Sequence, residues 1–333
     1  MKTIYHILLF VIVGLIACKN GPDNYKPRSI GAPGEVLVVV DSQYWTTRAG
    51  KSIRELVDLD FPALPQSESM FRKTHITSGS FENHFKTYRN ILVVNIDSTN
   101  IASRIDYRRD IWALNQQIIE FYVADEAEFV ELFNHSTDDI QKYFYNGDIQ
   151  ALVKAYKKNP ASVGRHVKAK YGFDIAFPKG YKLKKDTSNF SWYVFDRLES
   201  QQGLLVYEWD LDSVKSMEPR DLLSLRNEIL HQEVPGSVEG SFMTTEDRFS
   251  VLLDRPKFGG VRWIELRGLW RVQGDFMGGP FVSYFYKDVR NNRLVMLDGY
   301  VYAPRKQNKA LYVREVEAMI KSFKMEVLTA SNN

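Results

Sequence analysis

The sequence predicts an α+β fold in two domains, the second of which is an antiparallel sheet with helices packed on it. Residues 35–160, the first block, interleave short apolar runs with segments of helical periodicity. Residues 161–328, the second block, contain runs of period-two alternation separated by polar or glycine-containing turns. Asn159-Pro160 interrupts the helical pattern between them, and 333 residues is a length typical of about two domains.

The first block is predicted to be an N-terminal α/β domain. It opens with EVLVVVD, Glu35–Asp41, a continuous apolar run typical of a buried strand. A helix is expected around residues 51–59. Asp125 and Glu128 have the spacing of a helix N-terminal cap, and helical character resumes over residues 138–158. We expect further strands at residues 71–77, 90–97 and 115–125.

The second block is predicted to be a C-terminal α+β sandwich domain. Its first strand-like runs, from Tyr171 onward, read as an antiparallel meander. Pro219 suits the first turn of a helix that Pro235-Gly236 ends, and a last helix is expected over residues 308–323. Between these helices lie further strand candidates, VRWIELRGLWRV, FVSYFYKD and RLVMLDGYVYAP.

The composition is that of an ordinary globular protein. Apolar residues make up 44% of the chain and charged residues 26%, and the formal net charge is +3. A charge this close to balance gives no electrostatic driving force toward a phosphate backbone, so no nucleic-acid partner is expected. The aromatic share of 13% suits a β-rich structure.

The N-terminal residues predict export and lipid anchoring. Residues 1–17 combine Lys2 with an apolar run that is shorter than the ~20 residues of a membrane span, which indicates a lipoprotein signal peptide. The order Leu-Ile-Ala-Cys ending at Cys18 resembles the bacterial lipoprotein box, which implies acylation of Cys18. Cys18 is the only cysteine of the chain, so no disulfide is expected to compete for it.

Residues 18–34 are predicted to be a flexible tether, because they are rich in Gly, Pro, Asn and charge and lack apolar periodicity. The expected location is the cell envelope, at the outer membrane and facing the periplasm, with surface exposure as the alternative. Lys19 and Asn20 follow the cysteine where surface-exported lipoproteins of this type favour acidic residues. The membrane is thus the first expected partner, through the N-terminal lipid.

Several motifs in order resemble one known family. IGAPGEVLVVVD, LPQSESMF, YRNILVV, RGLWRVQGDFMGGPFVSYF, LDGYVYAP and REVEAMIKSF are similar to the uncharacterised Bacteroidetes lipoprotein family that carries domain of unknown function 4837. The resemblance extends over nearly the whole mature chain and implies location and fold without an activity. The element order of the second block is also similar to the α+β sandwiches of the photosystem oxygen-evolving P subunit and Mog1 type.

One strand offers a candidate binding face. Alternation in VRWIELRGLWRV places Trp263, Arg267 and Arg271 on one side, where aromatic and guanidinium groups favour a glycan, an anionic ligand or an envelope protein. The alternative is that a helix covers this face, with the arginine stems packed beneath it. The leading hypothesis is therefore a binding or partner-docking module.

Enzymatic chemistry has weaker support. Gly274–Phe281 is glycine-rich but lacks a phosphate-loop pattern, so a turn between strands is expected there. The histidines show no metal-ligand spacing, and no metal or cofactor is predicted. No catalytic residue is assigned. A periplasmic hydrolase whose site is assembled from distant residues remains the alternative function.

Overall fold

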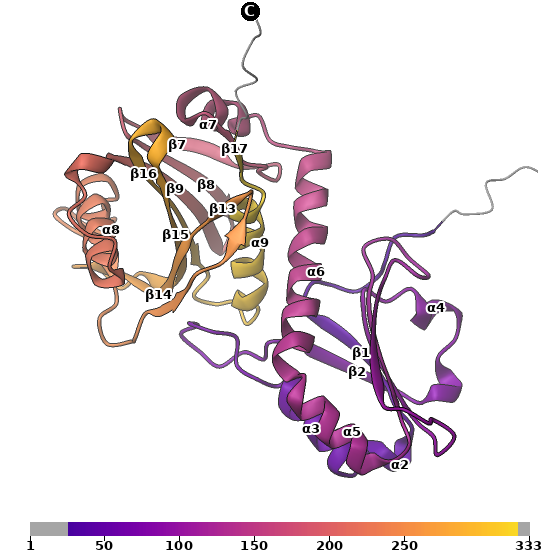
Figure 1. Cartoon of the computed structure of the whole chain (residues 1–333). Helices are drawn as coiled ribbons and strands as arrows, with labels where there is room; N and C mark the ends of the chain where they lie inside the picture. Colours follow the sequence, from indigo (N-terminus) through magenta and orange to yellow (C-terminus); the bar gives the residue numbers. More distant parts are fainter. Residues whose placement is uncertain (1–25, 326–333) are drawn as a thin grey trace, which may run out of the picture.

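The computed structural model describes residues 26–325, and these residues form two large sheets with helices around them and two small two-stranded ribbons (Figure 1). The α+β class predicted from the sequence is confirmed. The predicted signal peptide, Cys18 and residues 18–25 of the predicted tether lie outside the described residues. The prediction of a flexible tether up to residue 34 is wrong for its last part, because Arg28 and Ile30 form β-bridges with Leu114 and Tyr88 of the first block. Within residues 26–325, no helix combines the length and the apolar character that a membrane crossing requires.

The first block is built on a five-stranded mixed sheet of order β2-β1-β3-β5-β4. Four strands run parallel, and β4, which the sequence analysis missed, pairs antiparallel with β5 at the edge. The strands are β1 Glu35–Val39, β2 Arg72–Ile76, β3 Asn90–Ile96, β4 Arg104–Arg109 and β5 Gln117–Val123. The helices are α2 Ser42–Trp45, α3 Arg48–Val57, α4 Asn83–Lys86, α5 Glu126–His135 and α6 Thr137–Lys158.

Alternation along these strands places a different apolar cluster on each face of the sheet. One face packs on α3, α5 and α6 through residues such as Val38, Leu92 and Phe121. The other face carries Leu37 and Ile91 beneath aromatic residues of the loops and of α4. Asp125 caps α5 as predicted, because its carboxylate accepts a 3.0 Å hydrogen bond from the Glu128 backbone N–H.

The second block is built on an antiparallel eight-stranded sheet in which β10-β14-β15-β16-β9-β8-β7 form a continuous path and β11 pairs with β14. Its longer strands are β7 Lys182–Asp186, β8 Phe190–Arg197, β9 Ser200–Asp210, β14 Ile264–Gln273, β15 Gly278–Asp288 and β16 Arg293–Tyr302. The shorter ones are β10 Phe242–Thr245 and β11 Leu252–Asp254. Two small ribbons are formed by β12 Lys257–Phe258 with β13 Val261–Arg262, and by β6 Phe173–Asp174 with β17 Lys324–Met325.

Helices cover both faces of this sheet. α8 (Pro219–Glu233) packs on the face that carries Leu266 and Trp270, and α9 (Lys309–Lys321) packs on the face that carries Tyr284 and Leu297. Helix α7 (Val163–Tyr171) occupies the segment where the sequence analysis expected only a break before the meander. Gly299 of β16 lets α9 approach, because a Cβ at this position would lie 2.1 Å from the Val316 side chain.

The long helix α6 stands between the two sheets, beside α9 (Figure 1). One apolar cluster runs from the strands of the first block through α6 to α9 and the inner face of the eight-stranded sheet. The phenol of Tyr156 on α6 donates to the Glu315 carbonyl of α9 at 3.4 Å. This helix pair forms the walls of the largest cavity described below.

Candidate functional site

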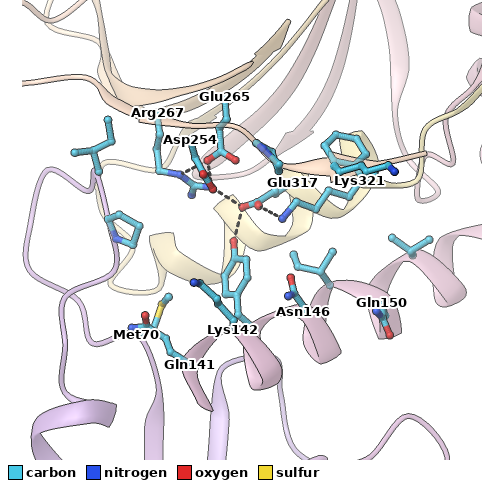
Figure 2. A pocket seen from close by; sticks show the side chains of 18 of the residues that line it. Met70, Gln141, Lys142, Asn146, Gln150, Asp254, Glu265, Arg267, Glu317 and Lys321 are labelled. Carbon is cyan, nitrogen blue, oxygen red and sulfur yellow. Dashed lines mark hydrogen bonds and ion pairs between the residues drawn. The ribbon is translucent and has the colours of Figure 1, made fainter. Parts of the chain in front are cut away.

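A cavity of about 900 Å³ lies between the two blocks (Figure 2). Its walls are α6, the inner face of β14, the C-terminal half of α9 and the segment from β11 to β12. Because α6 repeats every 3.6 residues, positions three or four apart share the face that it presents to the cavity. The lining residues from α6 are Gln141, Lys142, Tyr145, Asn146, Ile149, Gln150, Val153 and Lys154.

The wall opposite α6 carries a buried ionic network. Arg267 on β14 is 7% exposed, and its Nε and Nη2 donate to Glu265 Oε1 at 3.0 and 2.9 Å. Nη2 also donates to Glu317 Oε2 on α9 at 2.8 Å. Glu265 belongs to the same strand as Arg267 and Glu317 belongs to α9, so carboxylates from two elements fix the guanidinium where the cavity meets the sheet, as Figure 2 shows.

Glu317 is the centre of that network and is 1% exposed. Lys321 lies 2.7 Å from its Oε1, the Tyr284 phenol donates to the same oxygen at 3.1 Å, and the phenol of Tyr145 on α6 donates to Oε2. Burial alone raises the pKa of this carboxyl, but Arg267 and Lys321 oppose burial and hold the pKa well below its ordinary value of 4.5. Glu317 therefore stays ionised and links the second block to α6.

One donor of Arg267 is left over. Its Nη1 is buried and has no hydrogen-bond partner among the described residues. The Phe61 ring, with its centroid 5.8 Å from the guanidinium carbon, supplies a cation–π contact but no acceptor. A buried N–H without an acceptor costs about 1–3 kcal/mol.

The charges divide into a balanced interior and a basic rim. Arg267 and Lys321 are balanced by Glu265 and Glu317 at the sheet side of the cavity. The rim carries four exposed charged side chains, three lysines and one aspartate. They are Lys142, Lys154, Lys257 and Asp254. The interior thus suits a neutral acceptor, and the rim suits negative charge.

The three residues of the predicted binding face are separated in the structure. Trp263 is 1% exposed and stacks on Phe258 with ring centroids 4.9 Å apart, so it belongs to the core and not to a surface. Arg267 lines the cavity described above. Arg271 lines a second hollow of about 570 Å³ beside Glu246 and Arg248. The physical reason is that α9, with Phe323 after it, covers one end of β14 and leaves the other end free.

Two groups of lining residues were not identified from the sequence. The amides Gln141, Asn146 and Gln150 lie among charged residues of a long helix, where nothing in the pattern distinguishes them. Glu317 did leave a signal, because a carboxylate between Val316 and Ala318 interrupts a buried face of α9. A buried acid in an apolar stripe requires a partner, and Arg267 is that partner.

A second polar cluster bears on the hydrolase alternative. His166 on α7 contacts Asp186 Oδ2 at 3.1 Å, and Ser191 donates to Asp186 Oδ1 at 2.6 Å. Ser191 is completely buried, and none of the four cavities described in the structure is lined by this cluster. Residues 26–325 also contain no group of three or more His, Cys, Asp or Glu placed to hold a metal ion.

Two family models match the chain. Residues 160–322 match Domain of unknown function (DUF4837), and residues 29–157 match Domain of unknown function (DUF8532). The likeness to the first family, which the sequence predicts over nearly the whole mature chain, is thus found over the second block. The first block matches a different model. No match was found among curated proteins.

Solved structures with similar elements align with about half of the chain. The Ran-binding protein Mog1p of Saccharomyces cerevisiae is 9% identical, with a TM-score of 0.31 over 46% of this chain and 90% of that protein. LpqN of Mycobacterium tuberculosis, described as involved in cell envelope biogenesis, is 12% identical, with a TM-score of 0.27 over 46% and 82%. Human StAR-related lipid transfer protein 5 is 10% identical, with a TM-score of 0.21 over 52% and 96%.

Proposed function

We propose that this protein is a binding module of the cell envelope, anchored by a lipid on Cys18, whose ligand or partner occupies the cavity between α6 and β14. The tether in this proposal ends before Pro27, because the Pro27 carbonyl accepts from the Leu114 N–H at 2.8 Å and the Ile30 N–H donates to the Thr87 carbonyl at 2.9 Å. The outer membrane, on its periplasmic side, is the proposed location. The membrane is one partner, through the lipid, and an envelope protein or glycan is the other.

The buried Nη1 of Arg267 is the observation that carries the binding role. Two carboxylates accept from Nε and Nη2 and hold the guanidinium in place, so Nη1 is fixed without an acceptor of its own. A binding site needs a preformed polar group that a ligand completes, set in a largely apolar hollow. Met70, Leu252, Leu253 and Phe258 supply the apolar lining.

The test fills the cavity without touching its ionic network. Asn146→Trp puts a large side chain on the exposed face of α6 that lines the cavity, and Ala155→Trp puts the same side chain on an exposed α6 position outside it. The intact lipoprotein and both variants are captured from membranes, and bound species are identified by mass spectrometry. We expect a species that is lost with Asn146→Trp and retained with Ala155→Trp. Equal recovery with all three proteins would refute a role for the cavity.

A further inference from the structure

The cavity borders a free sheet edge. β11 pairs with β14 on one side, and no strand pairs with its other side within residues 26–325. Leu252, Leu253 and Asp254 are all exposed, the two leucines by 46% and 47%. An open edge with apolar side chains is a template for one more strand, and proteins that do not use such an edge normally protect it.

The residues of β11 that line the cavity show that the cavity lies along the unpaired edge of this strand. Successive side chains of a strand point to opposite faces of a sheet, so a hollow on one face contacts alternate residues. This cavity is lined by Leu252, Leu253 and Asp254 in succession. It therefore runs beside the backbone of β11, where an incoming chain would pair.

The opposite wall can satisfy a polypeptide backbone. Gln141, Asn146 and Gln150 lie on the face of α6 that lines the cavity, and Figure 2 shows them across the cavity from Arg267. Each side-chain amide offers both a carbonyl acceptor and N–H donors. The balanced charge around Arg267 suits a neutral acceptor at Nη1, and a peptide carbonyl is such an acceptor.

The rim selects for charge. Lys142, Lys154 and Lys257 are exposed around the opening, with only Asp254 among its exposed lining residues as an opposing charge. Of these lysines, Lys154 donates to the Asn115 side chain at 3.1 Å, a neutral partner that leaves its charge uncompensated. Acidic side chains on an added strand complement this rim.

We propose that the occupant of the cavity is an extended, acidic polypeptide segment of an envelope partner, which adds to the edge of β11 as a new strand. The inference rests on the proposed function of the cavity and specifies its ligand. Main-chain hydrogen bonds to β11 supply affinity, and the leucines and rim lysines supply specificity through alternate side chains, as in other strand-addition complexes.

The probe is a displayed library of random dodecapeptides, selected on the intact mature protein. We expect enriched sequences with acidic residues and apolar residues in period-two alternation. The variant Lys142→Glu, Lys154→Glu, Lys257→Glu should reverse the charge preference. The control variant Lys182→Glu, Lys215→Glu, Lys287→Glu changes exposed lysines outside the cavity by the same amount and should leave the preference unchanged. Thermal melts check that both variants fold.

A second arm tests the backbone pairing itself. A selected peptide is synthesised with one N-methyl group at each position in turn, which removes one main-chain donor at a time. Strand addition predicts a loss of at least about tenfold in affinity at one or two positions that are two residues apart, because β11 has three residues and only every second N–H of the peptide faces it. Equal tolerance at all positions, or a helical period of three to four, would overturn strand addition.

The possible outcomes distinguish failure of the peptide inference from failure of the proposed binding function. If no peptide is selected while Asn146→Trp still abolishes capture of a glycan, the cavity binds a ligand and the peptide inference is wrong. Concentration-dependent dimerisation lost in Leu253→Lys would make a second copy the occupant and would equally refute it. If neither peptides nor captured species depend on the cavity, both proposals fail.

Discussion

At the scale of single residues, Trp263 shows a limit of strand alternation. The same period-two pattern is compatible with an exposed tryptophan and with a buried one. Its ring stacks on Phe258 and meets Phe323 edge-on, with centroids 4.9 Å apart in each case. Period two identifies the face of a strand, but it does not reveal whether a helix covers that face. The covering helix comes from a segment about fifty residues further along the chain, which local patterns do not connect to β14.

Trp263→Ala is expected to reduce the free energy of unfolding by about 3–5 kcal/mol, because it removes a fully buried ring from a packed cluster. Urea unfolding of the purified variant measures this loss. Phe276→Ala removes a ring that is fully exposed on the β14–β15 turn and should change stability by less than about 0.5 kcal/mol. A Trp263 variant as stable as the Phe276 control would mean that the tryptophan is not packed as described.

Glu317→Gln tests the ionic network and its pH dependence. The variant leaves Lys321 and part of Arg267 unpaired in a buried site, so we expect a loss of about 3–5 kcal/mol at pH 7. The pKa of Glu317 is lowered in the folded protein, so its contribution is complete above its ordinary pKa of 4.5 and is lost as the pH falls below that value.

Urea titrations at pH 7, 4 and 3 follow this contribution. The stability gap between wild type and Glu317→Gln should narrow toward pH 3, because the unfolded wild-type chain takes up a proton before the folded one does. Glu239→Gln changes an exposed acid that forms no ion pair within residues 26–325, so this control should match wild type at each pH. A gap that stays constant with pH would contradict the lowered pKa.

At the scale of elements, local sequence predicted most helices and long strands. It failed where tertiary contacts determine the secondary structure. The capping residues Asp125 and Glu128 and the helix-opening Pro219 act within one turn, and each lies where predicted. The edge strands β4 and β11 were missed for different reasons. β4 has the sequence RIDYRR, in which charged residues predominate, and β11 has only three residues, too few to show alternation. β11 is the strand on which the candidate site depends.

The close approach of α9 to β16 at Gly299 can be tested directly. Gly299→Ala would place a Cβ 2.1 Å from Val316, so α9 or β16 must shift, at an expected cost of about 1–3 kcal/mol. Gly79→Ala is the matched control, because no atom lies within 4 Å of a Cβ there and its φ is not positive. Thermal melts should show a lowered midpoint for Gly299→Ala alone, and equal midpoints would contradict the close packing.

At the scale of the whole molecule, the two blocks have separate sheets but share side chains. A separate domain over residues 161–328, which the sequence predicts, should fold alone, since this segment contains its own strands and the helices that cover them. In the structure, α9 also packs against α6, and Tyr145 donates to Glu317 from the first block. The fragment lacks α6, so the buried carboxylate of Glu317 loses its packing against that helix and the hydrogen bond from Tyr145.

We therefore expect the fragment of residues 161–328 to unfold cooperatively but at a lower temperature than the intact chain. Circular dichroism melts of the two proteins measure the difference. Tyr145→Phe in the intact chain removes only the shared hydrogen bond and should lower the midpoint by less than the truncation does. A fragment without a cooperative transition would show that both blocks depend on one core.

The proposed membrane anchor determines where the cavity would act, and it depends on Cys18, which lies outside the described residues. Cys18→Ala removes the thiol that acylation requires, so the variant should leave the membrane pellet and accumulate as a soluble or uncleaved form. Fractionation with a labelled fatty acid measures both changes, and Lys19→Ala, next to the cysteine, should remain labelled and sediment with the membrane. Because binding at the cavity involves only folded residues, purified Cys18→Ala protein should still recover the species that Asn146→Trp loses. A Cys18→Ala protein that sediments and carries label as before would contradict the anchor and leave the cavity proposal standing.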